Sequence, residues 1–206
     1  MDGSDGQIIK ETEDVCKDLD LKVRIRQLYW VDRTVGRKFK ADECHFSLGL
    51  ATFPVSMKGR LDPKEWRPLI ASTMIYRKII SRNPPKSIVV TIAALFALLV
   101  GGLGILSKLF GDSGANLPSF LYIVLVIATF LANRSTQGRK NQRLQADLEA
   151  ARIFGRQELL STLRKIDGMG IPDVIQTENR GFSRHFSSKP SVAERISNVA
   201  AADWLR

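Results

Sequence analysis

Two long apolar runs constrain this chain more than any other feature. They cover residues 87–107 and 117–133, and the polar connector between them is too short to hold a domain. Because a helix needs about 20 apolar residues to cross the hydrocarbon core of a bilayer, the sequence predicts a transmembrane hairpin of two helices. The alternative, a hairpin buried in a globular core, is disfavoured because both runs are apolar on all sides and lack a polar face.

Basic residues flank the predicted hairpin on both sides, and they indicate its orientation. Five precede it and five follow it: Arg67, Arg77, Lys78, Arg82 and Lys86, then Arg134, Arg139, Lys140, Arg143 and Arg152. The connector carries only Lys108 and Asp112. Because Lys and Arg concentrate on the cytoplasmic side, we expect a multi-pass integral membrane protein with both termini in the cytoplasm. The expected location is the cytoplasmic membrane of a prokaryote, with an organelle membrane as the alternative.

The remaining composition is typical of one cytoplasmic domain with a basic side. The formal net charge is +10, although the first 20 residues are acidic, so the positive excess lies nearer to the predicted membrane. Such a collar attracts anionic lipids, which we expect as partners. No nucleic-acid partner is expected, because no recognition motif or set of stacking aromatic residues accompanies the basic charge. Cys16 and Cys44 fall on the predicted cytoplasmic side, where two buried thiols are expected instead of a disulfide.

Hydrophobic periodicity predicts a mostly helical domain with a small sheet. Before the hairpin, the expected elements are a helix over residues 8–19, strands over 21–32 and 46–52, and a helix over 61–82. After the hairpin, they are helices over 142–154 and 158–166, a loop over 167–189 and a last helix. Each flank is small, so we expect residues 1–86 and 134–206 to form two halves of one domain that residues 87–133 interrupt.

Capping residues mark the start of two of these helices. Asp62 and Glu65 begin the helix before the hairpin, and Ser191 with Glu194 forms a capping box for the last helix. Pro68 lies inside the first of these two helices, where it predicts a kink or a later start.

Three stretches carry motifs of one peptidase family. Residues 61–71 read LDPKEWRPLIA, residues 145–147 and 158–166 read QAD and ELLSTLRKI, and residues 186–196 read FSSKPSVAERI. In this order, with the apolar hairpin between the first two, they resemble the HtpX-type membrane zinc metallopeptidases, the family that includes the CAAX prenyl proteases. The resemblance covers nearly the whole chain. It implies an α+β membrane protein in which the hairpin is inserted in a mostly helical, gluzincin-like cytoplasmic domain with a small β-sheet.

The metal ligands of this family are replaced in the chain. The resemblance implies that the His-Glu-x-x-His motif falls on Ser72, Thr73 and Tyr76, and that the third ligand, a Glu, falls on Arg143. A guanidinium cannot bind a metal cation and repels one. The His of the family's His-Pro motif falls on Lys189. We therefore expect no catalytic residue, no metal and no cofactor.

Polar residues near the lost zinc site suggest a binding role. We expect Arg143 and Tyr76 to form a hydrogen bond across the former zinc hollow, with Asp147 or a lipid phosphate balancing the Arg143 charge. The alternative is that two unrelated polar side chains lie on packed helices. The candidate binding residues are Arg143, Asp147 and Lys189.

Two other chemistries are disfavoured. A catalytic pair of Ser72 and Lys78 is not expected, because residues six apart on a helix point in different directions. A metal site would have to combine Cys16, Cys44, His45 and His185. No pair of these residues has the spacing of a zinc finger.

The expected function is that of a non-catalytic pseudo-metallopeptidase, an accessory or structural subunit of a larger membrane protein complex. Its expected partners are other membrane protein subunits. Gly101, Gly102 and Gly104 give the first apolar run a close-packing face, which serves either such a partner or the second helix of the hairpin. Two alternatives stay open: an active membrane protease that has an atypical site or a catalytic partner, and a basic membrane-surface adaptor.

Overall fold

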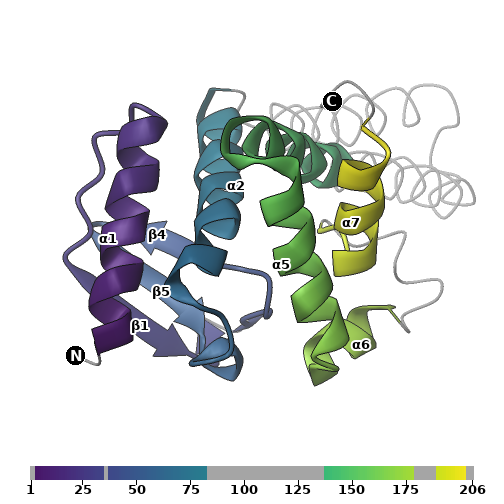
Figure 1. Cartoon of the computed structure of the whole chain (residues 1–206), viewed down its shortest axis with the longest axis horizontal. Coiled ribbons are helices and arrows are strands. Elements are labelled where there is room, and N and C mark those ends of the chain that lie inside the picture. Colours follow the sequence, from purple (N-terminus) through teal and green to yellow (C-terminus); the bar gives the residue numbers. More distant parts are fainter. Residues whose placement is uncertain (1–2, 35–36, 83–136, 179–188, 203–206) are drawn as a thin grey trace, which may run out of the picture.

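The computed structural model describes residues 3–34, 37–82, 137–178 and 189–202, and these form an α+β fold (Figure 1). The first helix and the long helix after the strands pack side by side; they are α1 (Gly3–Asp18) and α2 (Pro63–Arg82). The later part is helical at residues 137–154 and continues with α5 (Arg156–Gly168), α6 (Pro172–Glu178) and α7 (Val192–Ala200).

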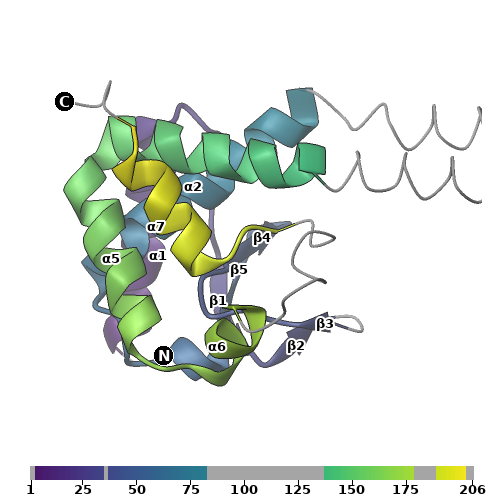
Figure 2. The same ribbon diagram turned by 90° about the vertical axis from the view of Figure 1, so that its right-hand side faces the viewer.

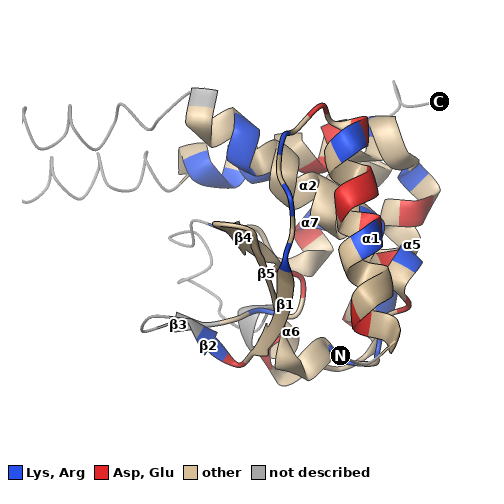
Figure 3. Ribbon diagram, turned by 90° about the vertical axis from the view of Figure 1, so that its left-hand side faces the viewer, with Lys and Arg blue, Asp and Glu red and all other residues tan. Residues whose placement is uncertain are grey.

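A three-stranded sheet lies against these helices. Its strand order is β1-β5-β4, with β1 (Gln27–Val31) parallel and β4 (His45–Ser47) antiparallel to the central β5 (Leu50–Pro54). Figure 3 shows α1 and α2 on one face of the sheet. The part of the chain before α2 also contains a separate antiparallel pair of strands, β2 (Arg33–Thr34) and β3 (Arg37–Lys38), and a short 3-10 helix, η1 (Val55–Met57).

The predicted second strand is a hairpin of two strands. Leu48 and Gly49 have φ angles of 47° and 82°, and a pair of residues with positive φ makes the tight turn that joins antiparallel strands. A Cβ on Gly49 would also approach the Arg24 carbonyl to 3.2 Å. The turn leaves the Leu48 side chain 98% exposed, whereas one continuous strand was predicted over residues 46–52. The first predicted strand is also shorter than expected, since only Gln27–Val31 pairs in the sheet.

Both flanks of the chain contribute to one hydrophobic core. Aromatic rings form its first part, with Trp66 fully buried and its ring centre 4.7 Å from that of Phe53 and 6.0 Å from that of Trp30. Leu159 and Leu163 of α5 are fully buried in the same cluster. The division of the chain at residues 87–133 is not tested by these contacts and stays a prediction.

The helices follow the sequence pattern closely. The start of α2 at Pro63 is confirmed, and the Asp62 N–H donates to the Glu65 carboxylate at 2.8 Å. Pro68 lies inside α2, so a later helix start is wrong. The capping box of Ser191 and Glu194 at the start of α7 is confirmed as well.

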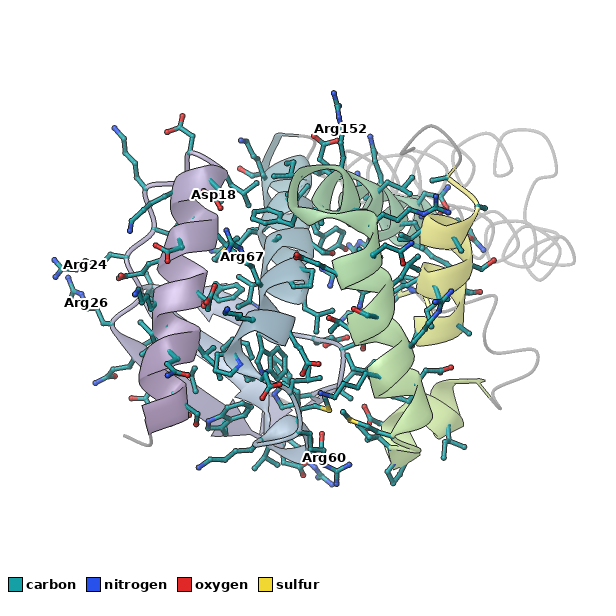
Figure 4. All side chains as sticks on the ribbon, in the orientation of Figure 1. Asp18, Arg24, Arg26, Arg60, Arg67 and Arg152 are labelled. Carbon is teal, nitrogen blue, oxygen red and sulfur yellow. The ribbon has the colours of Figure 1, made fainter. Side chains whose placement is uncertain are left out.

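An ion pair joins α2 to α1, and a break at Gly155 separates two later helical stretches. Arg67 of α2 points toward α1 (Figure 4), where it donates to the Asp18 carboxylate at 2.7 Å. Gly155, with a φ of 103°, separates the helical stretch at 137–154 from α5.

The predicted loop over 167–189 is wrong in part, because it contains α6. Asp173 of α6 accepts a hydrogen bond from the Ala41 N–H at 2.8 Å and so fixes α6 to the first flank.

The membrane part of the predicted fold class needs correction. The predicted hairpin, residues 87–107 and 117–133, lies outside the described residues. Among the helices that the structure describes, none combines the length and apolar composition needed to cross a membrane. The 20-residue helix α2, for example, carries Lys, Arg and Glu side chains, which are costly to bury in hydrocarbon. We therefore correct the fold class from an α+β membrane protein to an α+β fold with a small three-stranded sheet, and we do not retain the multi-pass location.

Candidate functional site

The middle of α2 places the predicted site residues in different surroundings. Ser72 is fully buried, whereas Thr73 and Tyr76 are half-buried. The Ser72 hydroxyl donates to Asp147 Oδ1, 2.5 Å away, in the helical stretch at 137–154. Ser72 therefore joins two helices and does not face the solvent.

Arg195 of α7 is fully buried and binds two carboxylates. Its Nε and Nη2 atoms donate to the two oxygens of Asp147 at 2.8 and 2.7 Å, and Nη1 donates to Asp42 Oδ2 at 2.7 Å. Burial lowers the pKa of Arg195, but the two carboxylates outweigh burial and raise the pKa above its ordinary value. Burial raises the pKa of Asp42, but Arg195, Arg143 and Lys40 together hold it below its ordinary value. Arg195 and Asp42 are therefore charged at neutral pH, and the bonds of Arg195 fix α7 to the rest of the fold.

The guanidinium of Arg143 lies beside the Thr73 and Tyr76 side chains. Both terminal nitrogens donate to Thr73 Oγ1 at 3.3 Å. The central carbon of the guanidinium lies 5.4 Å from the centre of the Tyr76 ring, within the range of a cation–π contact. The structure thus brings Arg143 and Tyr76 together, although by ring stacking and not by the expected hydrogen bond. The expected balancing of Arg143 by Asp147 is wrong, because Asp147 is bonded to Arg195.

Two further cations border the same region. Lys189 forms an ion pair with Glu43. Arg77 donates from Nη1 to the backbone carbonyl of Phe46 in β4. Figure 3 shows Lys and Arg residues at the end of α2 beside those at the start of the stretch at 137–154, and Figure 2 shows the same two helices adjacent. Within the described part of the chain, neither Arg77 nor Arg143 forms an ion pair with a carboxylate.

A cavity of about 410 Å³ lies among these residues. Its walls are α2, β4 with the loop before it, the stretch at 137–154, and the segment that leads into α7. The lining residues are Phe39, Asp42, Glu43, Cys44, His45, Phe46, Thr73, Tyr76, Arg77, Ile80, Arg143, Lys189, Pro190 and Arg195. Thr73, Tyr76, Arg143 and Lys189 of the predicted site therefore meet at one cavity, whereas Ser72 and Asp147 are not part of its lining.

The described residues around the cavity do not form a set of ligands for a metal ion. In the described ranges, no group of three or more His, Cys, Asp or Glu side chains is placed to hold one. Cys16 and Cys44 are both buried free thiols, and His185 lies outside the described residues. The Cys44 thiol donates to Thr73 Oγ1 at 3.1 Å, and burial raises its pKa to about 11. Lys78 donates to the Leu19 carbonyl at 3.5 Å, which leaves the Ser72–Lys78 pair without support.

Sequence reasoning missed Arg195 and Asp42 as parts of the site. A signal for Arg195 was present, because it lies three residues after Val192 and four before Val199, on the buried face of α7. An arginine within an apolar helical stripe requires acidic partners. No comparable local signal marks Asp42, whose role depends on contact with a residue 153 positions away.

No protein-family model, curated protein or solved structure matches this chain. The resemblance to HtpX-type metallopeptidases therefore gains no support from known proteins, and the label of a metallopeptidase-like family member is not retained as a finding.

Proposed function

We propose that this protein is a non-catalytic binding protein, an accessory subunit of a larger protein complex, built on a scaffold similar to that of a peptidase. The observation that carries the proposal is the placement of the Arg143 guanidinium against Thr73 and Tyr76 at the wall of the cavity. By resemblance, the residues at the matching positions of an active relative would hold zinc and its catalytic water.

Electrostatics supports the absence of metal catalysis. A unit positive charge about 4 Å from a divalent cation repels it by about 8 kcal/mol at an effective dielectric constant of about 20. Arg143 stays protonated under all ordinary conditions, so this repulsion cannot be removed by a change of pH. The side chains beside it supply hydroxyl groups, which are poor substitutes for imidazole or carboxylate ligands.

The chemistry of the nearby nucleophiles supports the same proposal. Ser72 is fully buried and its hydroxyl donates to Asp147, whose oxygens are already bonded to Arg195. Both oxygens of the carboxylate that faces Ser72 are therefore engaged by the buried Arg195 side chain. With its pKa raised to about 11, Cys44 is a thiol and not a thiolate at neutral pH, so it lacks the nucleophilic form.

A combined metal and hydrolysis assay tests the absence of catalysis. The full chain is purified without chelators, its metal content is measured by mass spectrometry, and casein and a peptide library are incubated with it with and without added zinc. A zinc endopeptidase serves as the positive control. We expect metal well below one equivalent and no cleavage. One equivalent of zinc, together with cleavage that a chelator abolishes, would instead establish the alternative of an active protease.

A complex from the native source tests the accessory role. Gentle purification followed by chemical cross-linking should yield the chain with the same partner at fixed stoichiometry in repeated preparations. Elution of the chain alone, at the mass of a monomer, would contradict the subunit role.

A further inference from the structure

We propose that the cavity bordered by Arg143 and Arg77 binds a small organic monocarboxylate whose apolar body lies along the aromatic side of the cavity. This inference rests on the proposed function, since it treats the cavity as a binding site, and it names the class of ligand. The cavity volume of about 410 Å³ lies in the range of about 300–1,000 Å³ that is usual for small-molecule sites.

Arg143 has unused capacity for an oxyanion. A guanidinium has five N–H donors, and the two that Arg143 uses both point to one oxygen, Thr73 Oγ1, at 3.3 Å. Three donors are therefore left without a partner among the described residues. A carboxylate accepts two parallel hydrogen bonds from such a planar donor, and bonds of this kind are shorter and stronger than those to a hydroxyl.

Arg77 supplies a second guanidinium at the same cavity. Its Nη1 atom donates to the Phe46 carbonyl, which holds the side chain against β4. That carbonyl is neutral, so within the described residues the charge of Arg77 is not balanced by an ion pair. Two guanidinium groups, from α2 and from the stretch at 137–154, therefore line one cavity.

The balance of charge around the cavity favours a monoanion. Lys189 is paired with Glu43, and Arg195 is shared between Asp42 and Asp147. Among the described residues, the lining carries four cations, and the three carboxylates that these pairs involve leave an excess of one positive charge: Arg77, Arg143, Lys189 and Arg195 against Asp42, Glu43 and Asp147. One carboxylate removes this excess, whereas a phosphate dianion would reverse its sign.

The rest of the lining suits an apolar ligand body. Phe39, Phe46, Tyr76 and Ile80 border the cavity, and Phe39 and Phe46 belong to the buried residues of the fold. One face of the Tyr76 ring is in contact with Arg143, which fixes the guanidinium next to an aromatic surface. A ligand with a carboxylate at one end and a hydrocarbon body matches this arrangement of charge and apolar surface.

Calorimetric titration of the purified full chain tests the ligand class. The carboxylate probes are octanoate and N-acetyl-leucine, the first a fatty acid and the second a mimic of a peptide C-terminus. Their neutral amides, octanamide and N-acetyl-leucinamide, and inorganic phosphate are the controls. We expect at least one carboxylate to bind with 1:1 stoichiometry, about 10- to 100-fold more tightly than its amide. The preferred probe then tells whether the natural ligand is a free acid or a chain terminus.

Variants connect the binding to the cavity. Arg143→Met and Arg77→Met each remove a charge while keeping most of the side-chain length, and each should weaken binding by about 10- to 100-fold. The matched control is Arg152→Met in the same helical stretch as Arg143, because Arg152 extends away from the molecule (Figure 4) and does not line the cavity. Its affinity should equal that of the unmodified chain. A thermal unfolding curve for each variant verifies that it is folded.

Each outcome separates this inference from the proposed function. Equal affinity for acid and amide, no binding of either carboxylate, tighter binding of phosphate, or unchanged affinity in both cavity variants would overturn the inference. None of these results bears on the absence of metal and hydrolysis. Conversely, zinc-dependent cleavage would refute the proposed function even if carboxylates bind at the cavity.

Discussion

Replacing Arg195 with Met should destabilise the fold strongly. The guanidinium is fully buried, and its removal leaves the Asp147 carboxylate, which is also fully buried, with only the Ser72 hydroxyl as a bonded side chain. Removing one partner of a buried ion pair costs about 3–5 kcal/mol, because the remaining charge is neither paired nor solvated. Since a domain is usually stable by only about 5–15 kcal/mol, the variant should lose a large part of its stability.

Guanidinium chloride unfolding, followed by tryptophan fluorescence, measures this loss. Trp66 is fully buried and lies in ring contact with Trp30, so unfolding changes the surroundings of both indoles. Arg152→Met removes an exposed arginine from the helical stretch that carries Asp147, and it should change the free energy of unfolding by less than about 0.5 kcal/mol. A loss below about 1 kcal/mol for Arg195→Met would refute the reasoning.

The pH dependence of the same experiment identifies the cause. In the unmodified chain the pKa of Asp42 is lowered, so its contribution to stability is present above the unfolded value of 3.8 and is lost as the pH falls through the folded value. Without Arg195, the effect of burial, which raises the pKa of Asp42, is opposed by fewer positive charges, so Asp42 takes up a proton at a higher pH. The difference in stability should therefore be greatest at neutral pH and shrink toward pH 4. In a double-mutant cycle with Asp147→Asn, the double variant should lose less than the sum of the two single variants.

Three further changes test local features of the fold by the same unfolding assay. Burial raises the pKa of Cys44 from 9.0 to about 11, so the stability that this thiol contributes is complete below pH 9 and is lost as the pH rises to 11. That loss should be about 3 kcal/mol and absent in Cys44→Ala. Gly155→Ala forces a side chain onto a φ of 103° and should cost about 1–3 kcal/mol, while Gly168→Ala, at a position with open space, should cost nothing. Ser191→Ala removes the capping hydroxyl of α7 and should cost about 1 kcal/mol.

The helices were predictable because their signals are local. Asp62 and Glu65 mark the start of α2, and Ser191 and Glu194 mark the start of α7, within four residues in each case. The strands were harder, because a period of two does not show where a chain reverses. Leu48 is a residue that rarely adopts a positive φ, so nothing in its type announced the turn at 48–49.

The site was predictable only where a residue's place follows from its helix. The resemblance implied that Arg143 lies near Tyr76, and the structure brings the two side chains together, with Thr73 as a further neighbour of Arg143. The partner of Asp147 was not, because the guanidinium that binds it, Arg195, lies 48 positions away in the sequence. Arg195 takes that carboxylate because its rigid donor set can satisfy Asp147 and Asp42 at once.

The two groups of polar residues divide structural and binding roles between them. One group consists of four side chains that hydrogen-bond to one another: Ser72, Asp147, Arg195 and Asp42. Because their donors and acceptors are used within the group, they have little capacity left to bind a ligand. Within the described part of the chain, Arg143 forms no hydrogen bond or ion pair with these four side chains, and its guanidinium lines the cavity beside Thr73 and Tyr76. Variants of the first group should therefore change the free energy of unfolding, whereas Arg143→Met should change carboxylate affinity with little effect on stability. Measuring the free energy of unfolding and the carboxylate affinity of Arg195→Met and of Arg143→Met decides whether the division holds. If the two groups shared one role, each variant would change both the free energy of unfolding and the affinity.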